Sequence, residues 1–241
     1  NPTGSGAPVT LARYNYAVPL SGSGLPDLTS DDATDQLRMW NQGSDPVTGY
    51  AMFGPDYTGP ASGAGVDWSR ADLQYADDQG YAVNTASYGA GAWQVTAVDY
   101  DADGNTVREL DAGATQAVRE AAAAGDPFDA GQVDALSTQT IYNADLKDST
   151  GKIVTDAGTL VTDTFGPVRN ASYTAVDGTE LVAPVRPHTH TAYDEGAPNT
   201  VSGVSINPVT GYPWRLPTTV TTGSAASDAT PDDADLQTIS T

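Results

Sequence analysis

Four strand-like segments over residues 73–110, and the turns between them, constrain the fold of this chain more than any other feature. Leu73–Tyr75, Tyr81–Tyr88, Trp93–Tyr100 and Thr106–Leu110 combine aromatic, β-branched and alternating apolar residues, and short turns rich in Asp or Gly separate them. This spacing is typical of β-hairpins, in which strands adjacent in sequence pair with each other. The pattern therefore predicts an antiparallel meander.

Further strands are expected on both sides of this meander. Residues 41–70 contain so many Gly and Pro residues that only short strands and loops fit there. The other expected strands are Val9–Val18, the neighbourhoods of Ile141 and Ile153, Leu160–Phe165, Ala171–Val176, Leu181–Val185, Thr189–Tyr193 and Leu236–Ser240.

One helical insertion near residues 112–138 interrupts the strands. Gln116–Ala124 is the strongest helix signal in the chain, and Gly125 is a natural stop for it. Asp129–Thr138 predicts a second, shorter helix, and Ser30–Trp40 predicts another because a capping serine precedes an acidic first turn.

A turn motif recurs along the chain. Tyr75–Gly80 and Tyr100–Asn105 share a tyrosine followed by Asp and Gly, Tyr193–Gly196 is a more compact copy, and Tyr142–Gly151 is a stretched one. The tyrosine ends a strand, the carboxylate accepts backbone N–H groups, and glycine adopts the positive φ of the turn. Each copy is therefore expected to be a hairpin rather than a ligand site.

Two nearly identical hexapeptides also indicate a repeated plan. Asp45–Tyr50 and Asn207–Tyr212 differ only in their first residue. Repeat architectures show this kind of self-similarity because each copy forms the same structural unit.

These motifs resemble a known family. Tyr100–Arg108 looks like the YD repeat of Rhs proteins and teneurins, and Asn84–Gln94 and Arg186–Gly196 resemble stretches in Rhs proteins of filamentous actinobacteria. The resemblance covers roughly residues 66–220. The residues that carry the repeat motif are Tyr75, Gly80, Tyr100, Asp101, Gly104, Asn105, Tyr193, Asp194 and Gly196.

The resemblance implies a spiral of β-hairpins that forms a hollow shell. Such shells enclose a C-terminal polymorphic toxin or, in teneurin-like relatives, support cell-surface recognition. The chain lacks a sequence like the Arg-Tyr-Tyr-Asp-Pro-x-x-Gly-Arg core that closes such shells, and Asp45–Gly49 resembles it only faintly. An interior shell segment is therefore expected, with flanking repeats of the same precursor or an enclosed toxin as its partner.

The expected fold is all-β, a shell segment of antiparallel hairpins with the short helical insertion. Three regions are expected: a Gly- and Pro-rich β and loop region over residues 1–65, a YD-repeat-like β-region over 66–220, and an acidic connector over 221–241 that ends in a strand.

The net charge excludes some partners. Ten basic and 31 acidic residues leave a formal charge of −21, which repels nucleic acid and bare anionic membrane. The chain has no cysteine, which excludes disulfides and thiolate chemistry. A secreted or cell-surface location is expected, and Asn1 in place of an initiating Met indicates a fragment or a processed chain.

Two clusters are candidate metal sites, although ordinary structural roles explain them as well. His188 and His190 lie two residues apart on an expected strand and so face the same side, with Asp194 as a conceivable third ligand. The oxygen-bearing residues Asp101, Asp103 and Asn105 could bind calcium, but they lack the spacing of an EF-hand and also suit a hairpin turn.

Three functions remain open: a structural scaffold, a carbohydrate-binding or adhesive domain, and a secreted hydrolase. The tryptophans Trp40, Trp68, Trp93 and Trp214, with twelve tyrosines, could line a sugar-binding face or pack between strands. The sequence has no nucleophile elbow and no phosphate-binding loop, so no residue is assigned a catalytic role and no cofactor is expected beyond calcium.

Overall fold

The structure, a computed structural model, describes residues 11–29, 36–148, 150–174, 177–198, 200–201 and 204–240. The prediction of a mostly antiparallel β fold is confirmed, with 41% of the residues in strands and 12% in helices. The chain divides into two compact units: unit 1 comprises Asn1–Asp99 and Leu110–Val133, and unit 2 comprises Tyr100–Glu109 and Asp134–Thr241.

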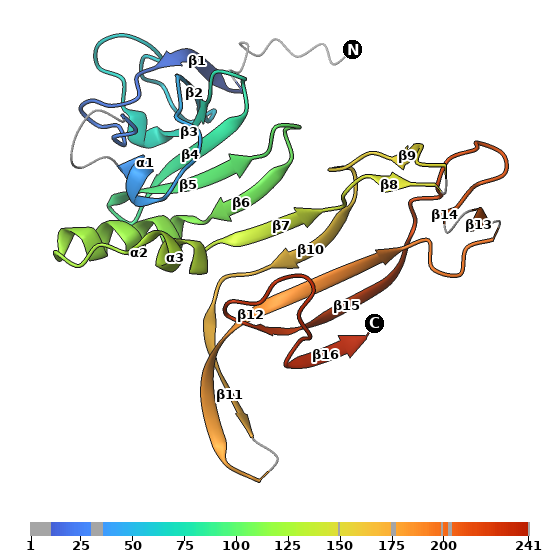
Figure 1. Cartoon of the computed structure of the whole chain (residues 1–241). Coiled ribbons are helices and arrows are strands. Elements are labelled where there is room, and N and C mark those ends of the chain that lie inside the picture. Colours follow the sequence, from blue (N-terminus) through green and yellow to red (C-terminus); the bar gives the residue numbers. More distant parts are fainter. Residues whose placement is uncertain are drawn as a thin grey trace, which may run out of the picture. The chain divides into compact units, whose positions relative to one another are not determined.

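Unit 1 contains an antiparallel sheet with its strands in the order β1-β2-β3-β4-β5 (Figure 1). In neither unit does the order of the described strands close on itself. The elements of unit 1 are β1 (Arg13–Val18), α1 (Gln36–Met39), β2 (Thr48–Phe53), the 3-10 helix η1 (Trp68–Arg70), β3 (Ala71–Ala76), β4 (Ala82–Gly89), β5 (Ala92–Tyr100) and α2 (Ala112–Ala123).

The unit 1 sheet has one buried and one exposed face because residues alternate along its strands. In β3, Ala71, Leu73 and Tyr75 are buried, while Asp72 and Gln74, which alternate with them, are exposed. The same alternation runs through β2 and β5. The buried face forms a core with the residues Leu28, Leu37, Trp40, Phe53, Val83, Val95 and Val118. Burying one face in this way is the usual solution for antiparallel sheets.

Helix α2 supplies part of this core. The Asp111 side chain caps it by accepting a hydrogen bond from the Ala114 N–H at 2.7 Å. Within the core, Trp40 Nε1 donates to the Thr115 carbonyl at 3.2 Å, and Thr115 Oγ1 donates to the Val95 carbonyl at 2.5 Å. The buried hydroxyl of Thr115 and the indole N–H of Trp40 are therefore paired, as buried polar groups in a stable core usually are.

Unit 2 contains a sheet with the strand order β6-β7-β10-β12-β15-β16, and β11 pairs with β12 as well. Two small hairpins, β8–β9 and β13–β14, interrupt the connections between sheet neighbours. The strands are β6 (Thr106–Leu110), β7 (Thr138–Tyr142), β8 (Leu146–Lys147), β9 (Ile153–Thr155), β10 (Val161–Phe165), β11 (Arg169–Thr174), β12 (Glu180–Tyr193), β13 (Thr200–Val201), β14 (Val204–Ser205), β15 (Pro217–Ala226) and β16 (Gln237–Ser240). Helix α3 (Ala130–Ala135) contains the sequence boundary between the two units, which lies after Val133.

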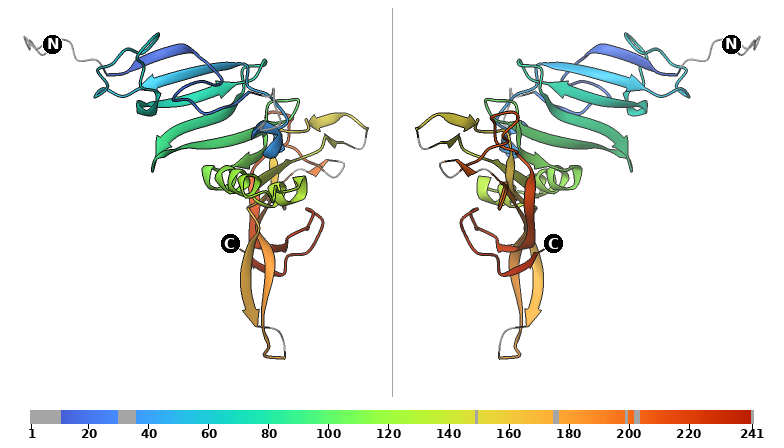
Figure 2. Two further views of the ribbon diagram at one scale, coloured as in Figure 1. Left: turned by 90° about the vertical axis from the view of Figure 1, so that its left-hand side faces the viewer. Right: turned by 90° about the vertical axis from the view of Figure 1, so that its right-hand side faces the viewer.

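Strand β12 is longer than the sequence indicates. Two strands were expected, over Leu181–Val185 and Thr189–Tyr193, but one strand of 14 residues spans both. Pro184 pairs with β11, and Pro187 pairs with β15 and accepts the Gly166 N–H through its carbonyl. The prolines therefore occupy ladder positions despite lacking an N–H. Before Val185, the first part of β12 pairs with β11 alone, and the two strands form a two-stranded arm (Figure 2).

The other expected elements differ at their boundaries. Only Gln36–Met39 of the helix expected over Ser30–Trp40 is helical, and residues 30–35 lie outside the described part, as do residues 9–10 of the first expected strand. The insertion near 112–138 forms α2 and α3, separated by Gly125 at φ 82°. The two units do not coincide with the three regions expected from the sequence. Residues Leu110–Val133, which include most of the insertion, belong to unit 1 together with the N-terminal strands.

The two hexapeptides, which are nearly identical in sequence, have different structures. Gly49 lies inside β2, where an added Cβ would meet the Val18 carbonyl at 2.6 Å and the Tyr75 ring at 2.9 Å. Gly211 lies in a turn at φ 75°, where its N–H donates to the Asn207 carbonyl. Glycine is therefore required at the first position for space and at the second for backbone conformation.

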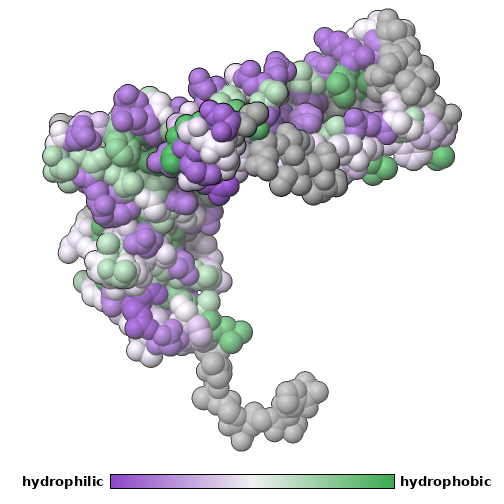
Figure 3. All heavy atoms as spheres, turned by 90° about the horizontal axis from the view of Figure 1, so that it is seen from below, coloured by the Kyte–Doolittle hydropathy of each residue, from purple (hydrophilic) through white to green (hydrophobic). Residues whose placement is uncertain are grey.

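Hydrophilic residues are spread over the face of the molecule seen in Figure 3, with hydrophobic ones in small patches. Across the described residues, no helix has the length and apolar character needed to cross a membrane.

Candidate functional sites in the turns and the buried histidine network

Three hairpin turns share one hydrogen-bond pattern, and each begins with an aspartate. Asp101 Oδ1 accepts the N–H groups of Asp103 and Asn105, both at 2.9 Å, while the Asp101 N–H donates to the Asn105 carbonyl. Gly104, at φ 84°, donates its N–H back to the Asp101 carbonyl. The turn begins at the residue after Tyr100, where β5 ends.

Asp77 and Asp148 occupy the same place in the other two turns. Asp77 Oδ1 accepts the N–H groups two and four residues later, at 3.0 and 2.8 Å, and Gly80 has φ 89°. Asp148 Oδ1 does the same at 2.9 and 3.1 Å, and Gly151 has φ 84°. The stretched copy over Tyr142–Gly151 therefore ends in this turn, between β8 and β9.

In two of these turns, hydrogen bonds within the turn lower the pKa of the aspartate. Hydrogen bonds from the Asn105 backbone and side chain lower the pKa of Asp101. The Thr150 side chain and the N–H groups of Thr150 and Lys152 lower the pKa of Asp148. Both oxygens of Asp101 accept hydrogen bonds, one of them from the Asn105 side chain, so the turn accounts for the side chains of Asp101 and Asn105, while Asp103 contributes its backbone N–H.

The compact copy over Tyr193–Gly196 is a different structure. Asp194 has φ 58°, and its side chain accepts the N–H groups of Arg215 and Leu216 at 3.0 and 2.9 Å. Its carboxylate thus joins the end of β12 to the segment before β15, more than 20 residues away. Gly196 has φ 66°. The Asp194 carbonyl does accept the Ala197 N–H in a tight turn. The prediction that this copy forms a hairpin is nevertheless wrong, because β12 pairs with β15, which begins more than 20 residues later.

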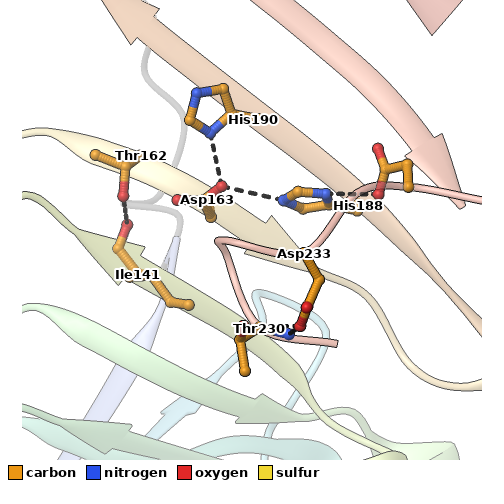
Figure 4. A network of polar contacts seen from close by, with 8 residues as sticks. Ile141, Thr162, Asp163, His188, His190, Thr230 and Asp233 are labelled. Atoms are coloured by element: carbon orange, nitrogen blue, oxygen red, sulfur yellow. Dashed lines mark hydrogen bonds and ion pairs between the residues drawn. The ribbon is translucent and has the colours of Figure 1, made fainter. Parts of the chain in front are cut away.

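His188 and His190 lie on one face of β12 and meet at Asp163 of β10. His188 Nε2 lies 3.0 Å from Asp163 Oδ1, and His190 Nδ1 lies 2.8 Å from the same oxygen (Figure 4). The other ring nitrogen of His188, Nδ1, lies 2.8 Å from Asp235 Oδ1. The side chains of Asp163, His188 and Asp235 are 3%, 5% and 7% exposed, whereas that of His190 is 47% exposed.

The network requires a specific distribution of protons. An ionised carboxylate only accepts hydrogen bonds, and a neutral imidazole has one donor and one acceptor nitrogen. His188 therefore satisfies both carboxylates only when both its nitrogens carry protons, or when one carboxyl group is protonated. Burial raises the pKa of Asp163, but hydrogen bonds from His190, His188 and Thr162 outweigh it and leave the pKa below its ordinary value.

Aromatic and cationic side chains pack around this network. The rings of Phe165 and His188 stack with centroids 4.2 Å apart and planes 3° apart. The Arg186 guanidinium lies 5.6 Å from the centroid of the Phe165 ring and donates to the carbonyls of Gly166 and Ser137. Burial lowers the pKa of Arg186. These contacts join β10, β12 and the segment before β7 around one polar centre.

The geometry favours a structural role for this centre over metal binding. No group of three or more His, Cys, Asp or Glu residues in the described ranges is arranged to hold a metal ion. Asp194, the conceivable third ligand, binds backbone N–H groups instead. A catalytic histidine base is often oriented by a carboxylate, and Asp163 orients the exposed ring of His190 in this way. Within the described ranges, however, no hydroxyl group that the base would activate hydrogen-bonds to that ring.

Sequence reasoning placed the two histidines on one face but missed both aspartates. Asp163 and Asp235 lie 25 and 47 residues from His188 in sequence. One feature of the sequence indicated the position of Asp163. It lies two residues from Phe165 on an expected strand, so the two side chains share one face of that strand.

The chain matches no family model, no curated protein and no solved structure.

Proposed function

We propose that this chain is a structural β-hairpin scaffold of the YD-repeat type, part of a secreted or cell-surface protein. In this role its hairpins pack against flanking repeats or an enclosed cargo, such as a toxin, and the finer architecture is a spiral shell. The scaffold contributes shape and exclusion of solvent rather than catalysis.

The sparse apolar core of unit 2 carries the proposal. Among the described residues of this unit, the buried hydrophobic ones are Phe165, Val185 and Ala225. Large hydrophobic residues are exposed instead: Leu146, Ile153, Leu181, Val182, Val209, Tyr212, Leu216 and Leu236. Apolar burial is the main favourable contribution to folding, so a unit built in this way is best stabilised by a neighbour that covers these residues.

The three Asp-x-x-Gly turns support the repeat type. The same carboxylate-to-backbone pattern recurs at Asp77, Asp101 and Asp148, each in the short connection between two consecutive strands. The buried network around His188 supports a structural role as well, because a side chain 5% exposed offers little surface to a substrate. Unit 2 in this way replaces part of an apolar core with paired polar groups.

The proposal is tested on the protein from its native source. The chain is captured under mild conditions, and its size and composition are measured by sedimentation velocity and mass spectrometry. We expect a particle well above the 24.8 kDa of this chain that contains further repeats or a protected cargo. A 24.8 kDa monomer with one sharp unfolding transition would overturn the proposal.

A matched pair of variants tests the same proposal on the recombinant chain. Val182 lies on the two-stranded arm and is 68% exposed, and Val47 in unit 1 is 58% exposed. Val182→Asp is expected to reduce self-association through the uncovered arm, whereas Val47→Asp leaves it unchanged. Equal effects of the two substitutions count against the proposed packing surface.

A further inference from the structure

The exposed face of the unit 1 sheet contains a groove of about 590 Å³. It runs over β1, β2, β3 and β4, which lie side by side in Figure 1. The residues that matter for its chemistry are Tyr14, Tyr16, Tyr50, Met52, Asp72 and Gln74. All of them lie on the side of the sheet opposite to the core, because buried residues alternate with them in β2 and β3.

Three tyrosines form an exposed aromatic cluster on one side of the groove. Tyr14 and Tyr16 are 55% and 72% exposed and stack with their ring centroids 6.2 Å apart at 17°. Tyr50 meets Tyr16 edge to face at 6.2 Å and is 36% exposed. An exposed patch of large rings of this kind marks a binding surface more often than a structural one.

Strand β1 is held from its other side, which keeps the cluster in place. Arg13 and Asn15 alternate with the two tyrosines and point to the loop after β2, where Arg13 donates to the Gly59 carbonyl. The Asn15 side chain donates to the Ala61 carbonyl at 2.8 Å. The rings therefore project from a fixed strand rather than from a loop.

Polar groups on β3 complete the groove beside the rings. Gln74 pairs with Tyr50 across β2 and β3, and Asp72 pairs with Met52. Both polar side chains are exposed, and neither forms a side-chain hydrogen bond within the part of the chain that the structure describes. An amide and a carboxylate beside aromatic rings provide donors and acceptors at the edge of an apolar platform.

We propose that this groove binds a neutral saccharide. A pyranose ring has an apolar C–H face that stacks on tyrosine, and hydroxyl groups at its rim that hydrogen-bond to Gln74 and Asp72. Nucleotides also stack on aromatic rings, but the net charge of −21 and the carboxylate of Asp72 repel phosphate. Charge therefore decides between these two ligand classes in favour of an uncharged sugar chain.

The experiment uses the whole chain and a defined panel of probes. Cellohexaose, xylohexaose and hexa-N-acetylchitohexaose, all uncharged, are titrated calorimetrically, with heparin and an oligothymidylate as polyanionic probes. We expect binding of at least one neutral hexasaccharide and a loss of at least tenfold in affinity for Tyr16→Ala. The control is Tyr212→Ala, because Tyr212 is 61% exposed but lies in unit 2.

Each other outcome overturns the proposal. Binding that is unchanged in Tyr16→Ala, preference for heparin or the oligonucleotide, or no binding of any neutral probe contradicts a neutral saccharide site. A chain that dimerises through this face, and becomes monomeric in Tyr16→Ala without binding sugar, also contradicts it. The result is independent of the scaffold role, which is measured on the native particle.

Discussion

Replacing His188 by alanine is expected to destabilise unit 2 far more than the same change at His190. His188 lies between two carboxylates that are 3% and 7% exposed, and its removal leaves both without this donor. Breaking a buried charged pair by removing one partner costs about 3–5 kcal/mol. The stack on Phe165 adds roughly 0.5–1.5 kcal/mol to the loss.

His190→Ala is the matched control, because it removes a ring from the same aspartate at a solvent-exposed position. Its side chain is 47% exposed, and Asp163 keeps its contact with His188. Exposed pairs contribute about 0–1 kcal/mol, so the two substitutions are expected to differ by at least about 2 kcal/mol.

The comparison is made by urea unfolding followed by far-ultraviolet circular dichroism, and hydrogen exchange locates the effect. Because the two units need not unfold together, exchange in β10 and β12 reports on unit 2 and exchange in β3 and β4 serves as an internal reference. We expect His188→Ala to reduce protection in β10 and β12 alone. Equal losses in both histidine variants, within about 0.5 kcal/mol, would refute the view that the buried bridge stabilises this unit.

Three further outcomes are expected, each measured by denaturant unfolding. Gly104→Ala costs about 1–2 kcal/mol because Gly104 has φ 84°, whereas Gly89→Ala costs nothing because its φ is not positive and no atom lies within 4 Å of the added Cβ. Gly211→Asn costs about 1 kcal/mol or less, because asparagine tolerates the left-handed conformation. Gly49→Asn costs at least about 2 kcal/mol, because its side chain would collide with the Val18 carbonyl and the Tyr75 ring. Equal costs of the two substitutions would contradict this explanation. The pKa of Asp163 is lowered in the folded state, so the stability that this carboxylate contributes is present above its ordinary pKa of 3.8 and is lost as the pH falls through the lower folded value. The denaturant concentration at the unfolding midpoint is therefore expected to decrease between about pH 5 and about pH 2, and Asp163→Asn is expected to flatten this decrease.

The sequence predicts the strands of this protein better than it predicts the contacts among distant residues. Alternation along β3 and β5 identified both strands, since their burial follows the pattern of a half-buried sheet. The length of β12 was missed because two prolines normally indicate a break, yet both lie in ladder positions here. The partners of His188 were missed because nothing in local sequence specifies which aspartates, 25 and 47 residues away, meet it.

The two hexapeptides show why a local motif indicates a turn or a strand only together with its partners. In Asp45–Tyr50 the neighbouring strands β1 and β3 pair with the segment on both sides, so it extends into β2. In Asn207–Tyr212 the Asn207 N–H donates to the Tyr212 carbonyl, and the same letters close a turn. Long-range pairing overrides local preference in strands. The Asp-x-x-Gly pattern forms the same turn at three places because the aspartate satisfies the backbone within five residues, and this local closure makes such a turn suitable for repeated use in a scaffold.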